Sequence, residues 1–382
     1  MHWFFILIAV LAILLIVGLA YLFSRFRRLF LLGEKTEDVP KKKRSVATGA
    51  AAAVMILLIL GCVVWPYILI VPVLHLIVFW ALLEQLMKFV EWVVRKNDAK
   101  EQNERKRPQE KTVPFWMAGI LAMLLTVIYM AVCYYLAVHV CKTEYTIKTD
   151  KDVPPLRVAL IADSHVGACF DGNGFAEHMK TIEEQHPDIL VIAGDFVDDD
   201  TSKTDMVRSC AALGEMNTTY GVYYVPGNHD AGYSDNRGFS YDDLLSELRK
   251  NDVTVLEDES VLIADKYYLV GRNDRSMERM TIDRLLMFIQ PAYYTIVLDH
   301  QPNDYAAEAQ AGCDLVLSGH THGGQMFPVG ILSDLLGAND ATYGLKVKDN
   351  TTFIVTSGIA DWAIPYKSGT VSEYCIIDIQ PE

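Results

Sequence analysis

Five short segments in the C-terminal half of the chain contain side chains that bind metal ions: DSH, GD, GNHD, DHQP and GHTH. Their candidate ligands are Asp163, His165, Asp195, Asn228, His300, His320 and His322. This mixed oxygen and nitrogen set suits Mn, Fe or Zn, and it lacks the thiolates of a structural zinc site. Seven ligands are too many for one ion but fit two divalent ions if one carboxylate bridges them, and we favour Mn.

Two metal ions about 3.5–4 Å apart can hold a hydroxide at neutral pH and stabilise both ends of an in-line phosphoryl displacement. The segments differ in how strongly they point to such a centre. DSH alone and a Gly-Asp pair after a strand are common in ordinary turns, whereas GNHD is a poor core sequence. GHTHGGQ is the most specific, because two histidines two residues apart and flanked by glycines have little use in packing.

Each of these segments follows a short apolar run that is typical of a buried strand. The runs lie within Leu156–Ala162, Asp188–Ala193, Tyr220–Val225, Thr295–Leu298 and Leu315–Leu317, and helical stretches are expected at Phe175–Gln185 and Met206–Met216. In open α/β sheets, ligands bind beyond the carboxyl ends of the strands. We therefore expect an α/β domain whose strand ends bring the candidate ligands together.

The N-terminal third has a different character, because four apolar stretches there are long enough to cross a bilayer. They cover about Trp3–Phe23, Val46–Trp65, Tyr67–Val90 and Pro114–Val140. They are apolar all round, unlike helices that bury one face. The first is a poor signal peptide, since no Lys or Arg precedes it and a basic cluster follows it. We predict four transmembrane helices in residues 1–144 and a second domain in residues 145–382.

Charge predicts the orientation of the chain. The first and third connections between the spans are rich in Lys and Arg, which favours a cytoplasmic location for both. The C-terminal domain is then extracytoplasmic, beside the outer face of a plasma or cytoplasmic membrane. The net charge is +7 for residues 1–144 and −21 for residues 145–382. A domain this acidic repels nucleic acid, so we expect no nucleic-acid partner.

The seven cysteines show no metal-binding spacing, and buried single thiols are the simplest interpretation. A disulfide among Cys169, Cys210, Cys313 and Cys375 stays open if the domain is extracytoplasmic.

From Leu156 to Ile379, the chain resembles the calcineurin-like metallophosphoesterase superfamily, and GHTHGGQMFP is most similar to its membrane-anchored YkuE/YaeI-type branch. The resemblance implies two β-sheets sandwiched between helices. By motif, it implies that the first metal is held by Asp163, His165 and His322, the second by Asn228, His300 and His320, and that Asp195 bridges.

The resemblance also implies two catalytic residues. His229 matches the residue that protonates the leaving oxygen, a role that suits an imidazole at neutral pH. Asp198 matches the carboxylate that orients this histidine. One departure concerns Lys367, since this branch often has Pro-x-Arg where the chain has Pro365-Tyr366-Lys367. Because a lysine lacks the planar two-point grip of a guanidinium, substrate recognition there is in doubt.

The leading hypothesis is hydrolysis of a phosphomonoester or phosphodiester at the outer membrane surface. An anchored site favours substrates already there, such as lipid-linked or envelope-derived phosphoesters. The alternative is a membrane sensor or partner-binding module with a non-catalytic phosphoesterase-like domain. Metal content distinguishes the two, because only the enzyme requires two ions per chain.

Overall fold

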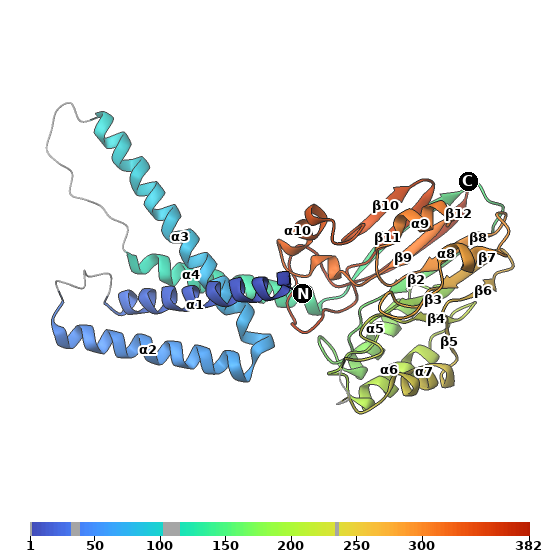
Figure 1. Cartoon of the computed structure of the whole chain (residues 1–382), viewed down its shortest axis with the longest axis horizontal. Coiled ribbons are helices and arrows are strands. Elements are labelled where there is room, and N and C mark those ends of the chain that lie inside the picture. The colour runs from blue at the N-terminus through green and yellow to red at the C-terminus, as the bar shows by residue number, and fades with distance from the viewer. Residues whose placement is uncertain (1, 32–38, 102–114, 234–236) are drawn as a thin grey trace. The chain divides into compact units, whose positions relative to one another are not determined.

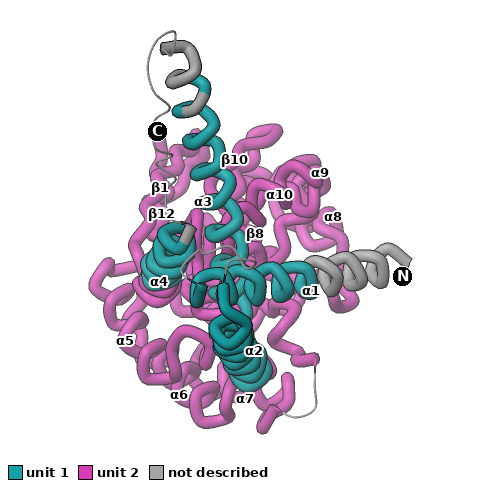
Figure 2. Tube along the Cα trace, turned by 90° about the vertical axis from the view of Figure 1, so that its left-hand side faces the viewer, with its two compact units in different colours: residues 1–131 teal, residues 132–382 magenta. Residues whose placement is uncertain are grey.

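The computed structural model describes residues 2–31, 39–101, 115–233 and 237–382. The chain forms two compact units, residues 1–131 and 132–382 (Figure 2). Part of the first connection between the spans, residues 32–38, and most of the third, residues 102–114, lie outside the described residues. The orientation predicted from these connections therefore stays a prediction.

The N-terminal unit is helical (Figure 1). Its helices are α1 (His2–Phe30), α2 (Lys41–Val64), α3 (Pro66–Glu101) and α4 (Phe115–Val138), of which the last continues into the second unit. Among the described residues, three helical segments are long and apolar enough to cross a membrane: Lys41–Val64, Pro66–Val94 and Trp116–Val138. The side chains of residues 2–14 lie outside those described, so the fourth predicted span stays a prediction.

Small residues let these helices pack closely. Trp80 of α3 is fully buried, and a Cβ on Gly119 of α4 would lie 2.5 Å from its ring, so this contact needs a glycine. His75 points its Nδ1 at the Val71 carbonyl at 2.9 Å and packs against the Tyr129 ring, as a helix-packing residue does. Most other apolar side chains of α2 and α3 are exposed, which suits helices surrounded by lipid.

The second unit contains two six-stranded mixed sheets. The first has the order β1-β12-β2-β3-β4-β5 and the second the order β10-β11-β9-β8-β7-β6. The first sheet is built from β1 (Cys141–Thr149), β12 (Glu373–Pro381), β2 (Leu156–Ile161), β3 (Ile189–Ala193), β4 (Val222–Val225) and β5 (Val253–Val255). The second is built from β10 (Gly344–Lys348), β11 (Thr351–Val355), β9 (Leu315–Ser318), β8 (Tyr294–Leu298), β7 (Tyr267–Gly271) and β6 (Glu259–Ile263). Four neighbouring strands of the first sheet, β2, β3, β4 and β5, run parallel. In the second sheet, the parallel neighbours are β7, β8, β9 and β11.

Alternating strand residues place the two sheets face to face. Val158, Leu160 and Val191 share a buried cluster with Ile296 and Leu315 of the other sheet. The intervening residues of β2 and β3 pack instead under α5 (Gly172–Glu183), α6 (Lys203–Gly214) and α7 (Tyr241–Lys250). The outer face of the second sheet is covered by α8 (Ile282–Leu286) and α9 (Tyr305–Gln310). All five predicted strands and both predicted helical stretches are present, and the two sandwiched sheets agree with the expected fold.

The last two turns of α4 belong to the second unit and are tied to its C-terminal segment. The backbone N–H of Lys367 donates to the Cys133 carbonyl at 3.0 Å, and that of Ser372 donates to the Leu136 carbonyl at 3.0 Å. After α4, only His139 and Val140 precede β1. All seven cysteines lie within the described residues and are free, so the disulfide left open by the sequence is not formed.

Candidate metal centre

The five predicted strand ends deliver their side chains to one place. Asp163 and His165 follow β2, Asp195 follows β3, and Asn228 follows β4, all in the first sheet. The other three candidate ligands come from the second sheet, where His300 follows β8 and the remaining two histidines follow β9. The site therefore lies where the carboxyl ends of two sheets meet.

One cluster consists of Asp163, His165 and His322, whose potential ligand atoms all lie within 4.8 Å of one another. Asp163 and His165 are fully buried, and His322 is nearly so. Both carboxylate oxygens of Asp163 accept the backbone N–H of His320 at 2.9 Å, which fixes the carboxylate in place. The rings of His165 and His322 stack with centroids 5.1 Å apart. These residues are the set predicted for the first metal.

A second cluster consists of Asp195, His300 and His320, again within 4.8 Å of one another. The His300 ring directs Nδ1 at the Ala193 carbonyl at 2.8 Å, so its Nε2 is left facing the cluster. His320 directs its Nδ1 at the side-chain oxygen of Asn228 at 2.9 Å. Asn228 thus contacts a member of this cluster, and its assignment as a ligand of the second metal stays a prediction.

Asp195 lies between the two clusters. Its Oδ2 is 3.1 Å from Nε2 of His300 and 3.7 Å from Nε2 of His165, one histidine from each cluster. Its Oδ1 accepts the backbone N–H of His229 at 2.8 Å. Within the described residues, the Asp195 carboxylate therefore lies close to a histidine of the first cluster and to a histidine of the second.

The two predicted catalytic residues lie beside the first cluster. Asp198 places one oxygen 3.2 Å from Nδ1 of His165 and the other 3.5 Å from Nδ1 of His229. It therefore contacts a candidate metal ligand as well as the histidine it was predicted to orient. Burial lowers the pKa of His229, but the neighbouring carboxylates Asp198 and Asp195 outweigh this effect and raise it above its ordinary value. A raised pKa favours the protonated imidazole, which is the form able to donate a proton.

The backbone at the site is strained. Five of the candidate ligands adopt positive φ angles that non-glycine residues rarely have: Asp163, His165, Asp195, His320 and His322, with values from 34° to 71°. Each such conformation costs on the order of 1–3 kcal/mol and persists where the surroundings enforce it, usually at functional sites. Glycines make room for these turns, because a Cβ on Gly227 would lie 2.2 Å from the Asp195 carboxylate and one on Gly194 would lie 2.5 Å from the His300 ring. The fold thus maintains a costly backbone around these seven side chains.

Orphaned nitrogen atoms show that the residues fit metal ions. Within the described part of the chain, Nε2 of His165 and Nε2 of His300 are buried without a hydrogen-bond partner. A buried polar atom without a partner costs roughly 1–3 kcal/mol, and a metal ion would satisfy both atoms. Burial and the proximity of His300 lower the pKa of His320 to about 4, so this ring is neutral at pH 7, as a ligand must be.

Two functional candidates lie outside the predicted set. Asp361 is fully buried, with Oδ1 3.6 Å from Nδ1 of His322 and 3.1 Å from the Lys367 ammonium. Lys367 is itself fully buried and also donates to the Ser357 carbonyl at 2.6 Å. This lysine, where the chain departs from the family's Pro-x-Arg, contacts the carboxylate behind a candidate ligand. No local pattern revealed this role, because Asp361 is 39 residues from His322 in the sequence.

The final Asp of GNHD is the other candidate. Asp230 is fully buried, and its carboxylate accepts the backbone N–H groups of Phe196, Val197 and Gly227 at 2.7–3.0 Å. It thereby ties the turn after β3 to the turn after β4. Burial and the nearby charge of Asp195 raise the pKa of Asp230 to about 6.

The comparisons with known proteins agree with this geometry. The profile described as calcineurin-like phosphoesterase matches residues 156–324. An uncharacterized metallophosphoesterase of Aquifex aeolicus is 32% identical over 206 residues, covering 52% of this chain and 74% of that protein. The chain belongs to the calcineurin-like metallophosphoesterase family. The segment predicted to resemble this family contains the whole matched range.

Other metallophosphoesterases extend the relationship. One from Helicobacter pylori is 32% identical over 248 residues, or 62% of each chain. A transmembrane protein with a metallophosphoesterase domain from Bos taurus is 30% identical over 245 residues, or 59% of this chain and 53% of that protein. The chain thus spans less than two thirds of the length of these two relatives. YkuE of Bacillus subtilis matches at 26% identity over 200 residues, or 50% of this chain and 68% of YkuE, which confirms the predicted relationship to it.

Proposed function

We propose that this metallophosphoesterase hydrolyses phosphoesters with two divalent metal ions, for which Mn is our first choice. Asp163, His165 and His322 would hold one ion. Asn228, His300 and His320 would hold the other, and Asp195 would bridge them. The observation that supports the proposal most is the position of the Asp195 carboxylate, within 3.7 Å of a histidine from each of two buried clusters.

Two bound ions would supply an activated water and positive charge against the phosphoryl oxygens. The chain's own residues do the remaining work. The domain is strongly acidic, so an anionic substrate is attracted only where bound cations reverse the local field. The His300 ring is held in a fixed orientation by the hydrogen bond between its Nδ1 and the Ala193 carbonyl, which keeps its Nε2 directed at the second cluster.

His229 is the proposed proton donor to the leaving oxygen. Its Nδ1 faces Asp198 at 3.5 Å, and its ring lies between Tyr233 and Trp362, with centroid distances of 5.0 and 5.4 Å. The carboxylate keeps the ring protonated and oriented, and the two aromatic rings limit its rotation. Trp362 is 46% exposed, so we expect the substrate to approach from this side.

The proposed location is the outer face of a membrane. Its support is the three candidate spans among the described residues, the apolar sequence of α1, and the excess of Lys and Arg in the connections expected to face the cytoplasm. An extracytoplasmic site held there favours lipid-linked or envelope-derived phosphoesters over soluble ones.

The test is hydrolysis of bis-p-nitrophenyl phosphate and p-nitrophenyl phosphate by the full chain in nanodiscs, with Mn, Fe or Zn added after metal removal. We expect metal-dependent release of p-nitrophenol, and the preferred substrate distinguishes diester from monoester cleavage. Activity that survives exhaustive chelation, or full activity in Asp195→Ala, would overturn the proposal.

A further inference from the structure

An unusually apolar helix lies on the surface of the phosphoesterase domain. Helix α10 (Val329–Leu336) has no buried residue, and its sequence is VGILSDLL. Together with Phe327, its apolar side chains form what we call the α10 face: Phe327, Val329, Ile331, Leu332, Leu335 and Leu336. The exposed fractions of Phe327, Leu335 and Leu336 are 61%, 76% and 81%. Within the described part of the chain, nothing covers this face.

The helix lacks the buried apolar face of a helix that packs on a soluble core. A surface helix normally turns its apolar residues inward and its charges outward. Here the only charged residue of α10, Asp334, is exposed and accepts a hydrogen bond from the Thr342 hydroxyl at 2.7 Å, while the five apolar side chains of the helix are exposed as well. Two leucines follow Asp334 and point away from the domain's core clusters. Solvent alone gives no reason for this arrangement.

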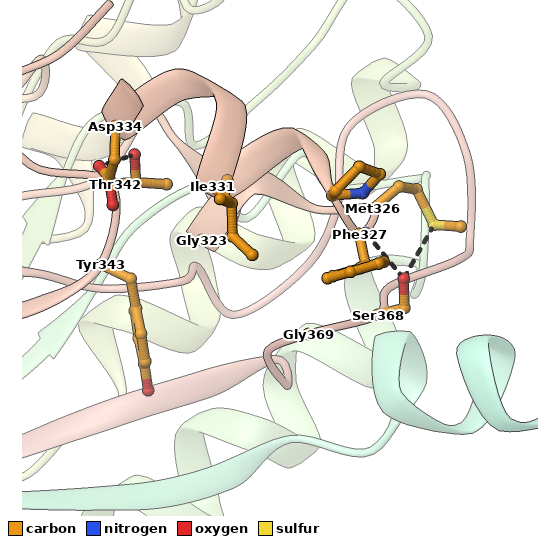
Figure 3. Close-up of a pocket in the computed structure, with 11 residues that line it drawn as sticks. Gly323, Met326, Phe327, Ile331, Asp334, Thr342, Tyr343, Ser368 and Gly369 are labelled. Atoms are coloured by element: carbon orange, nitrogen blue, oxygen red, sulfur yellow. Dashed lines mark hydrogen bonds between the residues drawn. The ribbon is translucent and has the colours of Figure 1, made fainter. Parts of the chain in front are cut away.

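Helix α10 does not contribute side chains to the hydrophobic core of the domain either. A cavity of about 330 Å³ lies between the helix and the segment that contains Ser368 and Gly369. Figure 3 shows Ile331 and Asp334 on one side of this cavity and Ser368 with Gly369 on another. A helix that spans a cavity and buries no side chain contributes little to the core.

The position of α10 suggests what covers it. Phe327 donates its backbone N–H to the Ser368 hydroxyl at 2.9 Å, and the neighbouring Lys367 N–H donates to the Cys133 carbonyl of α4 at 3.0 Å. Helix α4 contains the candidate span Trp116–Val138, whose last turns belong to this domain. Two hydrogen bonds, through the neighbouring residues Lys367 and Ser368, therefore connect the α10 face to the end of α4 at which the chain would leave the bilayer.

We propose that the α10 face inserts into the lipid leaflet that α4 enters and docks the phosphoesterase domain on the bilayer. This inference rests on the proposed membrane anchoring. The face contains no Lys or Arg, so apolar burial rather than attraction to anionic lipids drives the docking, and salt should leave it unchanged. The segment Gly323–Pro328 joins the face to His322, so docking would set the height of the metal centre above the lipid headgroups.

The direct test uses the full chain in phosphatidylcholine nanodiscs. Leu335→Cys receives a fluorophore, and quenching by lipids with a nitroxide on the acyl chain reports contact with hydrocarbon. The matched control is Phe288→Cys, because Phe288 is 89% exposed and comes two residues after α8, a helix that Figure 1 shows at a distance from α10. The unsubstituted chain, labelled in parallel, corrects for native cysteines.

We expect strong quenching at position 335, unchanged by high salt, and little at position 288. Equal quenching at both positions would overturn the proposal. So would protection of position 335 by a second copy of the chain, which would appear as disulfide-linked dimers of the unlabelled Leu335→Cys variant together with no lipid quenching of the labelled one.

Activity provides an independent arm. Leu335→Asp combined with Leu336→Asp should reduce hydrolysis of dioleoylglycerol p-nitrophenyl phosphate in the bilayer by about tenfold or more, because aspartate is strongly disfavoured in hydrocarbon. Hydrolysis of soluble bis-p-nitrophenyl phosphate should be unchanged, as should both activities in Phe288→Asp. Equal loss on both substrates would mean that α10 supports the site rather than docks it, and would overturn the proposal. If the unsubstituted chain cleaves neither substrate, the proposed function fails, and the quenching experiment still decides the docking.

Discussion

The two ligand clusters differ in what stands behind their histidines. In the first, the outer ring nitrogen atoms face carboxylates: Nδ1 of His165 is 3.2 Å from Asp198, and Nδ1 of His322 is 3.6 Å from Asp361. In the second, Nδ1 of His300 faces a neutral oxygen, the Ala193 carbonyl, and Nδ1 of His320 faces the neutral amide oxygen of Asn228, itself a candidate ligand. A carboxylate behind a histidine makes it a more basic ligand. The comparison indicates that metal ions bound at the two clusters would be held with unequal affinities.

The proposed proton donor, His229, is linked to the first cluster. Asp198 contacts both His165 and His229, so the better-supported cluster is also the one coupled to His229. We expect the first ion to be held tightly and the second to be the one that is lost and replaced more easily. The following predictions are ways to test this asymmetry.

Loss of the shared carboxylate should have the largest effect. Asp195→Ala removes the group that contacts both clusters, so we expect activity to fall by about 10³-fold or more, the scale of removing a key charge-stabilising group. Metal analysis should show fewer than two ions per chain. Asp200→Ala is the control, since this exposed carboxylate lies in the same loop. Equal metal content in both variants would contradict the proposal that Asp195 bridges two metal ions.

Replacement of the proposed proton donor should separate chemistry from metal binding. His229→Gln should lower kcat by about 10²-fold or more, the contribution typical of general acid catalysis, while two ions stay bound. The effect should be smaller for bis-p-nitrophenyl phosphate than for an ester with a poorer leaving group, which needs protonation more. An equal effect on both esters would contradict the assignment.

The buried Asp361–Lys367 pair should act on the first cluster alone. Lys367→Met leaves a buried carboxylate unpaired, which should destabilise the domain by about 3–5 kcal/mol in thermal unfolding. Asp361→Asn combined with Lys367→Met should recover much of that stability. It should still bind the first ion about 10–100-fold more weakly, because the support behind His322 is gone. Weakening of the second ion instead would show that the two clusters are not supported separately.

Acid should release the second ion first. Although burial lowers it, the pKa of His300 is raised above its ordinary range by Asp195, so the metal-free ring holds its proton more strongly than a free imidazole does. A metal must displace that proton, and its affinity therefore falls as the pH is lowered. Dialysis at stepwise lower pH, followed by metal analysis, should give an intermediate with one ion per chain. Simultaneous loss of both ions would contradict the asymmetry.

The convergence of the candidate ligands could be predicted from the sequence because each follows a short buried strand. A polar residue directly after an apolar run is visible locally, and the paired histidines of GHTHGGQ have little use in packing. Convergence of these segments followed from the rule that sites form at strand carboxyl ends. That three strands belong to one sheet and two to the other depends on long-range pairing, and nothing local encodes it.

Other parts depend on contacts between distant residues. Strand β12 lies between β1 and β2, so its place is set by residues more than 200 positions away in the sequence. The role of Lys367 depends on burial beside Asp361, and its neighbours in the sequence suggested a different one. Helix α10 has the composition of a buried helix, and only the structure reveals that its leucines are exposed.

The most direct test of the central claim is the metal content of the full chain. After reconstitution with Mn and removal of loosely bound ions, mass spectrometry of the metals should give two ions per chain for the unsubstituted protein and fewer for Asp195→Ala. One ion or none in the unsubstituted protein, under conditions in which it hydrolyses bis-p-nitrophenyl phosphate, would contradict a two-metal centre.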